Sequence, residues 1–241
     1  MSESLAGRTV LVTGANGGLG TEFVTQALAR GAAKVYAAAR TPQQWGDDRI
    51  VPLPLDITDP AAVARAVVLA PDVDLVVNNA AIAPVGDSIA GPEDELRRVF
   101  ETNFFGNLRV ANGFSPVLAA NGGGTLLNVL STAAWISVPT AYGASKAALW
   151  SATNALRLQL GGQGTHVIGL LVGMIETPMS TRWDVPKVSA ESVVAQAYDG
   201  VVSGALEVLA DDTTRELKAI LNTPGEQLYP ALEEQLKAFV A

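Results

Sequence analysis

The chain has 241 residues and a formal net charge of −8, with 49% hydrophobic and 17% charged residues. This composition argues against a disordered chain and against a nucleic-acid-binding protein, which would show clustered lysines and arginines. Because there is no cysteine, disulfides, thiol nucleophiles and cysteine-ligated metals are excluded, and the single histidine, His166, excludes a site with several histidine ligands.

The chain begins with Met1–Gly7, which lacks the basic start and apolar run of a signal peptide. No later stretch approaches the roughly eighteen consecutive apolar residues that span a membrane. We therefore expect a cytoplasmic protein. Its length suits one α/β domain better than two small ones.

The first predicted elements are a strand at Thr9–Val12, a glycine-rich turn at Thr13–Gly20 and a helix that continues to Arg30. The turn and the helix start place free backbone N–H groups at the positive end of a helix dipole, which binds phosphate. The spacing Gly14-x-x-x-Gly18-x-Gly20 differs from the commonest dinucleotide fingerprint, but it allows close approach to a pyrophosphate. The alternative is a surface turn that needs only backbone flexibility.

A second strand is predicted at Lys34–Arg40. In a dinucleotide-binding fold, an acidic residue at the end of this strand accepts hydrogen bonds from the adenosine ribose. Here Ala38 and Ala39 occupy the corresponding positions and Arg40 follows them. A guanidinium without a carboxylate suits a 2′-phosphate, so the sequence favours NADP(H) over NAD(H). The alternative is an arginine that is simply exposed in a loop.

A third strand is predicted at Ile50–Leu55, and a helix with Asp59 as its N-cap runs to about Leu69. Asp56 lies just beyond the strand end. Its carboxylate either reaches an adenine edge or stabilises a local turn.

A fourth strand over residues 74–81 carries two amides, Asn78 and Asn79, near its end. Because strand carboxyl ends form the ligand crevice of open α/β sheets, these amides either tie strand ends together or line a cofactor. A long helix then begins near Gly91 with an apolar side that extends to Ala111. Asn103 is a polar residue within that apolar series, so its amide needs a partner or a function.

A fifth strand is predicted at Thr125–Leu130, followed by Ser131 and by a helix that begins near Thr140. Tyr142 and Lys146 are four residues apart and share one face of this helix. An isolated phenol has a pKa of about 10, and a fixed lysine charge can lower it. The pair alone also fits an exposed helix with an interfacial tyrosine and a solvated lysine.

The remaining chain continues the alternation of strands and helices. We expect a sixth strand at Thr165–Val172, an irregular segment at Met174–Lys187, a helix over residues 189–203, a short strand at Leu206–Leu209 and helical residues 213–241. The irregular segment is either a substrate lid or an ordinary connection. The pattern predicts a single-domain Rossmann-type doubly wound parallel sheet of about seven strands with helices on both faces.

Several short motifs occur in the order and at roughly the spacings of one known family. They are Thr13-Gly14-x-x-x-Gly18-x-Gly20, Asp56-Ile57-Thr58, Asn78-Asn79-Ala80, Asn103, Ser131 and Tyr142-x-x-x-Lys146. Over about Gly7 to Leu209 the chain resembles the short-chain dehydrogenase/reductases. The chain departs from the family at Ala81 and Val172, where glycine and proline are usual, and in a shorter spacing from Ser131 to Tyr142.

The resemblance implies an NADP(H)-dependent oxidoreductase of the carbonyl reductase or alcohol dehydrogenase type, acting on a small-molecule carbonyl or alcohol. It implies that Tyr142 is the general acid/base and that Ser131 hydrogen-bonds the substrate oxygen. Lys146 would hold the nicotinamide ribose and lower the pKa of Tyr142, and Asn103 would keep a water in a proton relay to Lys146. The implied cofactor-binding residues are Gly14, Asn16, Gly18, Leu19, Gly20, Arg40, Asp56, Ile57, Asn79, Ala80, Tyr142, Lys146, Ile175 and Thr177. No metal is expected.

We expect a dinucleotide-binding half at about residues 7–130, a catalytic and substrate half at about 131–210 and a helical C-terminal extension at about 211–241. This extension departs from the family's usual ending, so we expect a homodimer through the helices near residues 92–121 and 140–160, with a tetramer as the alternative. Two other functions are kept: a non-catalytic NADP(H)-sensing or scaffold protein, and a dehydratase or epimerase of the same family.

Overall fold

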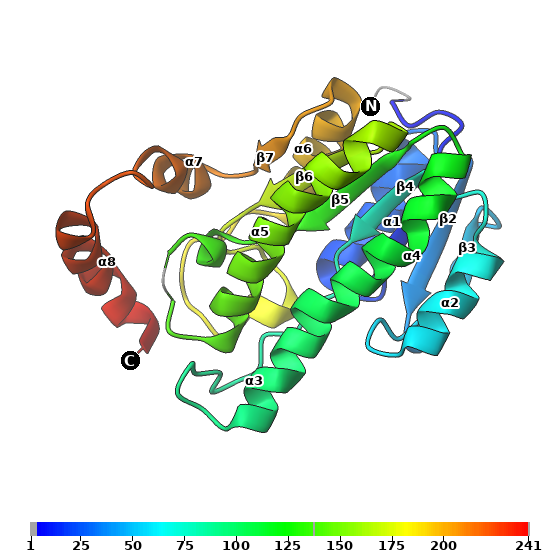
Figure 1. The fold of residues 1–241 in the computed structure, drawn as a ribbon. Coiled ribbons are helices and arrows are strands. Elements are labelled where there is room, and N and C mark those ends of the chain that lie inside the picture. Colours follow the sequence, from blue (N-terminus) through cyan, green and yellow to red (C-terminus); the bar gives the residue numbers. More distant parts are fainter. Residues whose placement is uncertain (1–3, 137, 241) are drawn as a thin grey trace.

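One parallel sheet forms the centre of the protein. The computed structural model describes residues 4–136 and 138–240, and its strands follow the order β3-β2-β1-β4-β5-β6-β7 (Figure 1). The strands are β1 (Thr9–Thr13), β2 (Lys34–Ala39), β3 (Ile50–Pro54), β4 (Leu75–Asn78), β5 (Thr125–Val129), β6 (His166–Leu171) and β7 (Glu207–Leu209). The predicted Rossmann-type fold with about seven strands is therefore confirmed.

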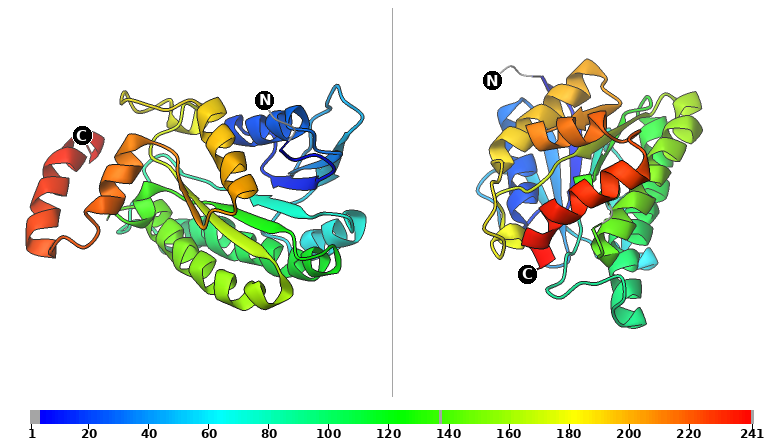
Figure 2. Two further views of the ribbon diagram at one scale, coloured as in Figure 1. Left: turned by 90° about the horizontal axis from the view of Figure 1, so that it is seen from above. Right: turned by 90° about the vertical axis from the view of Figure 1, so that its left-hand side faces the viewer.

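Helices cover both faces of this sheet (Figure 2). One face carries α1 (Gly18–Ala29) and α6 (Ala190–Ser203), and the other carries α2 (Pro60–Leu69), α4 (Asn107–Ala120) and α5 (Ala141–Leu160). Each face has its own apolar core. Under α1 and α6 the rings of Phe23 and Tyr198 meet edge to face at 5.5 Å, and Phe114 is fully buried on the opposite face. Because all strand pairs are parallel, the carboxyl ends of the strands lie at the same edge of the sheet.

The long helix that the sequence predicts from Gly91 is three helical segments. It consists of α3 (Glu93–Phe100), a π-helical segment (Glu101–Gly106) and α4, which continues to Ala120. Asn107 Nδ2 donates to the carbonyls of Thr102 (3.2 Å) and Asn103 (3.0 Å), which supports the wider turn. A π-bulge of this kind is common at functional sites.

The C-terminal helices extend beyond the β7 edge of the sheet, at the side opposite β3 (Figures 1 and 2). They are α7 (Asp212–Ala219) and α8 (Gly225–Val240), which form the helical residues expected over 213–241. Three short 3-10 turns lie elsewhere, at Thr132–Ala134, Gly161–Gln163 and Pro178–Ser180. Across residues 4–136 and 138–240, no helix has the length and apolar character needed to cross a membrane.

Candidate active site

The glycine-rich turn between β1 and α1 is built by close backbone contacts. Gly14 has φ +66°, and a Cβ atom there would lie 3.0 Å from the Cα of Ala80. At Gly20 a Cβ atom would lie only 2.1 Å from the carbonyl oxygen of Gly14. Asn79 Nδ2 donates to the Thr13 carbonyl (2.9 Å), so this amide ties the end of β4 to the turn.

The N-terminus of α1 has no side-chain cap. By contrast, α2, α5, α6 and α7 are capped by the side chains of Asp59, Thr140, Ser189 and Asp211. The first N–H groups of α1 therefore point toward the glycine turn without a side-chain acceptor. This arrangement fits a ligand phosphate.

We predict that Gly20→Ala disrupts this turn, because the new methyl group would meet a backbone oxygen that cannot rotate away. The expected loss of unfolding free energy is about 1–3 kcal/mol, and NADPH binding should weaken by at least about tenfold. Urea unfolding and fluorescence titration with NADPH measure the two effects. Gly161→Ala is the matched control, because a Cβ at Gly161 meets nothing within 4 Å. Equal stability of the two variants would contradict the prediction.

Asn78 belongs to a buried amide network. Its Nδ2 donates to the Asn107 carbonyl and to Asn128 Oδ1, both at 3.0 Å. Asn128 Nδ2 in turn donates to Thr153 Oγ1 at 2.9 Å. The network joins β4, β5, α4 and α5, so Asn78 ties elements together beneath the site.

At the end of β2, Arg40 is exposed and forms no ion pair or hydrogen bond within the described part of the chain. The loop after it is held by Asn16, whose Nδ2 donates to the Thr41 carbonyl at 2.8 Å. Asp56 Oδ1 accepts hydrogen bonds from both Thr58 N and Thr58 Oγ1, which lower the pKa of Asp56, and the charge of Arg40 lowers it further. Asp56 therefore stabilises a local turn beside an available guanidinium.

Ser131, Tyr142 and Lys146 come together at the carboxyl end of β5. The Lys146 Nζ atom lies 5.7 Å from the centroid of the Tyr142 ring and donates to the Val129 carbonyl at 2.7 Å. Lys146 is only 2% exposed, and this burial lowers its pKa from 10.5 to about 8. Ser131 lies two residues beyond the end of β5, where its Oγ accepts from Ala133 N at 3.2 Å, and a hydrogen bond with its side chain lowers the pKa of Tyr142.

The pKa of Tyr142 is raised above its usual value of 10.0. The family resemblance implies that Lys146 lowers this pKa. Burial raises the pKa of the Tyr142 phenol, and the hydrogen bond with Ser131 acts against that rise. Tyr142 is therefore protonated at neutral pH. The protonated phenol is the form that can donate a proton.

Asn103 is fully buried, and its amide is used within the protein. Its Oδ1 accepts from Ile82 N at 2.8 Å, and its Nδ2 donates to the Ile82 carbonyl (2.9 Å) and to Ser145 Oγ (3.1 Å). These contacts supply the partner that the sequence required. The water relay to Lys146 remains a prediction.

Other predicted cofactor residues are partly or fully buried. Leu19 and Ile57 lie in the two apolar cores. Ile175 forms an isolated bridge with Val188, and Thr177 Cγ2 lies 3.3 Å from where a Cβ atom on Gly18 would be. The irregular segment predicted at Met174–Lys187 thus passes against the glycine turn at Thr177.

Two residues outside the predicted set make long-range hydrogen bonds that involve the loop after β4. Asp87 accepts hydrogen bonds from the backbone N–H of Tyr142, and Arg182 donates to the Ala83 carbonyl at 3.2 Å. Both contacts join segments more than fifty residues apart in the chain. Neither residue belongs to a local motif, so no sequence signal identifies it.

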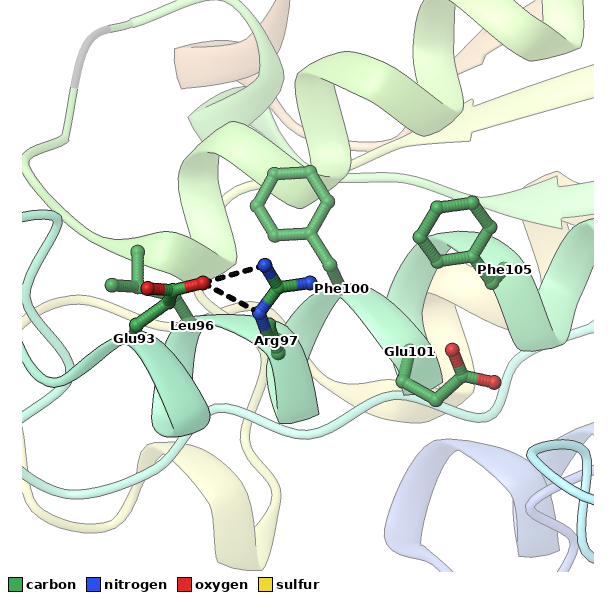
Figure 3. A pocket seen from close by; sticks show the side chains of 6 residues that line it. All are labelled: Glu93, Leu96, Arg97, Phe100, Glu101 and Phe105. Atoms are coloured by element: carbon green, nitrogen blue, oxygen red, sulfur yellow. Dashed lines mark hydrogen bonds and ion pairs between the residues drawn. The ribbon is translucent and has the colours of Figure 1, made fainter.

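A hollow of about 340 Å³ lies elsewhere, along α3 and the π-helical segment (Figure 3). It is lined by Glu93, Leu96, Arg97, Phe100, Glu101 and Phe105. None of the predicted catalytic or cofactor residues lines it, so this hollow is separate from the candidate active site.

Comparison with known proteins gives the family. A family described as short chain dehydrogenase matches residues 8–187. The chain belongs to the short-chain dehydrogenase family. A short-chain dehydrogenase, PC-15, from Penicillium crustosum is 35% identical over 92% of this chain and 88% of its own length. The 1-deoxy-11-beta-hydroxypentalenate dehydrogenase of Streptomyces exfoliatus is 29% identical over 93% of this chain and 94% of its own.

Solved structures agree with this assignment. A short-chain dehydrogenase from Burkholderia cenocepacia in complex with NADP superposes with a TM-score of 0.88 and 34% identity. The match covers 96% of this chain and 99% of that one. This short-chain dehydrogenase is thus an oxidoreductase of a family that uses nicotinamide cofactors.

Proposed function

We propose that the protein is an NADP(H)-dependent carbonyl reductase or alcohol dehydrogenase in which Tyr142 is the general acid/base. The observation that carries the proposal is the grouping of a protonated Tyr142, a hydrogen-bonded Ser131 and a buried Lys146 at the carboxyl end of β5. Strand carboxyl ends are where open α/β sheets bind ligands. At this strand end Tyr142 would supply a proton, Ser131 a hydrogen bond and Lys146 a positive charge.

The cofactor would lie across residues 7–130, the proposed dinucleotide-binding half. Gly14, Gly18 and Gly20 bring bare backbone to the pyrophosphate, and the uncapped N-terminus of α1 offers its N–H groups. Arg40 would bind the 2′-phosphate, with Asn16 holding its loop in place. When bound, the cofactor supplies the hydride. Residues 131–210 would then carry catalysis and the substrate contacts, with residues 211–241 as an extension.

In the direction of reduction, Ser131 would hydrogen-bond the substrate carbonyl oxygen and hold it beside Tyr142. As the carbonyl carbon receives the hydride, the Tyr142 hydroxyl gives its proton to the oxygen, so the product is a neutral alcohol. The resulting phenolate is stabilised by Ser131 and by the charge of Lys146. In oxidation the same phenolate accepts the alcohol proton.

We predict that Arg40→Ala reduces the preference for NADPH over NADH. The substitution removes the guanidinium that would pair with the 2′-phosphate, so kcat/KM for NADPH should fall by about 10- to 100-fold, with little change for NADH. Steady-state rates with both cofactors measure the ratio. Arg49→Ala is the control, because this exposed arginine is already paired with Asp47 at 2.7 Å. Comparable wild-type efficiencies with NADH and NADPH would refute the role of Arg40.

The substrate is proposed only as a small-molecule ketone, aldehyde or secondary alcohol. Initial rates with NADPH and NADH against aromatic, aliphatic and steroidal ketones test the reaction class. NADPH binding without oxidation across this panel would favour a sensing or scaffold protein. A product formed without net oxidation or reduction would favour a dehydratase or epimerase.

We also propose a homodimer, with a tetramer as the alternative. Phe105 is 48% exposed beside the hollow on α3, and Leu158 on α5 is 87% exposed. Both apolar side chains lie on the helices near residues 92–121 and 140–160. Burial of these two side chains in a dimer would remove their apolar surface from water.

A further inference from the structure

The backbone of Tyr142 is held by a segment that none of the family motifs includes. Asp87, in the loop between β4 and α3, accepts hydrogen bonds from Ala141 N at 3.1 Å and from Tyr142 N at 2.8 Å, one with each carboxylate oxygen. In the same loop, Ile89 N donates to the Pro139 carbonyl at 3.0 Å. The loop is therefore attached to both sides of the start of α5.

The loop after β4 is also connected to the carbonyl group of Tyr142, through the side chains of Ser145 and Asn103. Ser145 Oγ donates to the Tyr142 carbonyl at 2.7 Å and accepts from Asn103 Nδ2 at 3.1 Å. Asn103 in turn makes two hydrogen bonds to the backbone of Ile82, only five residues before Asp87. The peptide groups on the two sides of Tyr142 are thus fixed to one short stretch, residues 82–87, which directly follows the Asn79–Ala80 turn.

Asp87 is not needed simply to begin the helix. Thr140 is the N-cap of α5, and its hydroxyl accepts from Gly143 N at 3.0 Å. This local cap satisfies the usual requirement at a helix start. The additional carboxylate fixes the first two N–H groups, one of which belongs to the proposed general acid. A carboxylate that accepts backbone N–H groups also forms stronger hydrogen bonds than a neutral acceptor.

We propose that Asp87 is a positioning residue that sets the place of the Tyr142 hydroxyl for proton transfer. The inference rests on the proposed function of Tyr142. A side chain that donates a proton must lie within about 0.5 Å of its productive position, and a misplacement of about 1 Å can cost roughly 100-fold in rate. Asp87 reaches only the backbone, so it acts through Tyr142 and touches neither the cofactor turn nor the reacting oxygen.

The test is Asp87→Ala in the full-length protein, assayed with NADPH and the best ketone of the panel. We expect kcat to fall about 10- to 100-fold, while the Kd for NADPH, measured by fluorescence titration, stays within about twofold. Hydrogen exchange of the peptide that contains Ala141 and Tyr142 should become faster. Asp87→Asn should recover part of kcat, because its Oδ1 can still accept from one N–H group.

The matched control is Asp59→Ala, which removes a carboxylate cap from α2, where Asp59 Oδ1 accepts from Ala61 N at 2.8 Å. Loss of a cap should lower the Tm by about 2–4 °C, so both variants should melt slightly earlier. Only Asp87→Ala should lose kcat. Unchanged kcat in Asp87→Ala, or an equal loss in Asp59→Ala, would overturn the inference.

Failure of the proposed function gives a different result. If Tyr142→Phe retained wild-type kcat, the assignment of Tyr142 as the general acid would be wrong. The proposed role of Asp87 would then fail as well, because Tyr142 would need no exact position. If Tyr142→Phe lost activity while Asp87→Ala did not, only the inference about Asp87 would fail.

Discussion

Tyr142→Phe is expected to lower kcat for carbonyl reduction by about 100- to 10,000-fold, the range of a lost general acid. The phenyl ring keeps the packing and removes only the hydroxyl that Ser131 contacts. NADPH binding should change far less than kcat, because the phosphate turn lies on separate elements and keeps its contacts. Steady-state kinetics and fluorescence titration measure the two quantities.

A second tyrosine provides the control. Tyr36→Phe also removes a hydrogen-bonded hydroxyl, which donates to Asp72 at 2.8 Å, but Tyr36 is not among the proposed catalytic residues. Its kcat should stay within about twofold of wild type. If Tyr142→Phe and Tyr36→Phe had equal, near-normal rates, Tyr142 would not be the proton donor.

Lys146→Met is expected to remove activity and to stabilise the cofactor-free protein at the same time. Without the ammonium, the Tyr142 phenolate loses its nearby positive charge and the ribose loses a proposed contact, so kcat should fall by at least about 100-fold. Methionine is of similar length and apolar, so it fills the same buried space. The substitution therefore separates the catalytic value of the charge from its effect on stability.

The stability effect follows from the pKa of Lys146, which burial lowers from 10.5 to about 8. Below pH 8 the lysine is charged in both the folded and unfolded states, so the folded protein carries the full cost of burying the charge. Between pH 8 and 10.5 the unfolded state holds more protons, and stability rises with pH. A shift of this size corresponds to roughly 3 kcal/mol, partly offset in the variant by about 1 kcal/mol for the lost hydrogen bond to the Val129 carbonyl.

Urea unfolding of the wild type and Lys146→Met at pH 7 and pH 10 measures this effect. The variant should be more stable at pH 7 by about 1–3 kcal/mol, and the difference should shrink at pH 10 as the wild-type lysine loses its proton. A variant that is less stable than the wild type at pH 7, by an amount that does not change at pH 10, would contradict the prediction.

The alternation of apolar strands and helices was enough to predict the sheet, because the central strands β1, β4 and β5 are buried along their whole length and the helices that cover them carry an apolar side. The glycine turn was also predictable, since Gly14 and Gly20 occupy positions where a side chain would collide with backbone. The π-helical break in the long helix was not predictable from the sequence. It depends on the side chain of Asn107, which donates hydrogen bonds to the carbonyls of Thr102 and Asn103.

The site was predictable to the extent that its residues lie in local motifs. Tyr142 and Lys146 share a helix face, and Ser131 lies just beyond the end of a strand, so their neighbourhood follows from the fold. Asp87 reaches Tyr142 across 55 positions in the chain, and nothing in its own neighbourhood distinguishes it from other loop carboxylates. The direction of the Tyr142 pKa shift likewise depends on burial, which only the packed structure shows.

The most direct measurement of the central claim is the transfer of deuterium to a ketone of the panel from NADPH that carries deuterium at both C4 positions of the nicotinamide. Mass spectrometry of the product follows the label. We expect the alcohol to carry deuterium on its carbinol carbon in the wild-type reaction, with formation of the labelled alcohol slowed at least about 100-fold in Tyr142→Phe. An alcohol without deuterium, or labelled alcohol formed equally fast by both proteins, would contradict hydride transfer assisted by Tyr142.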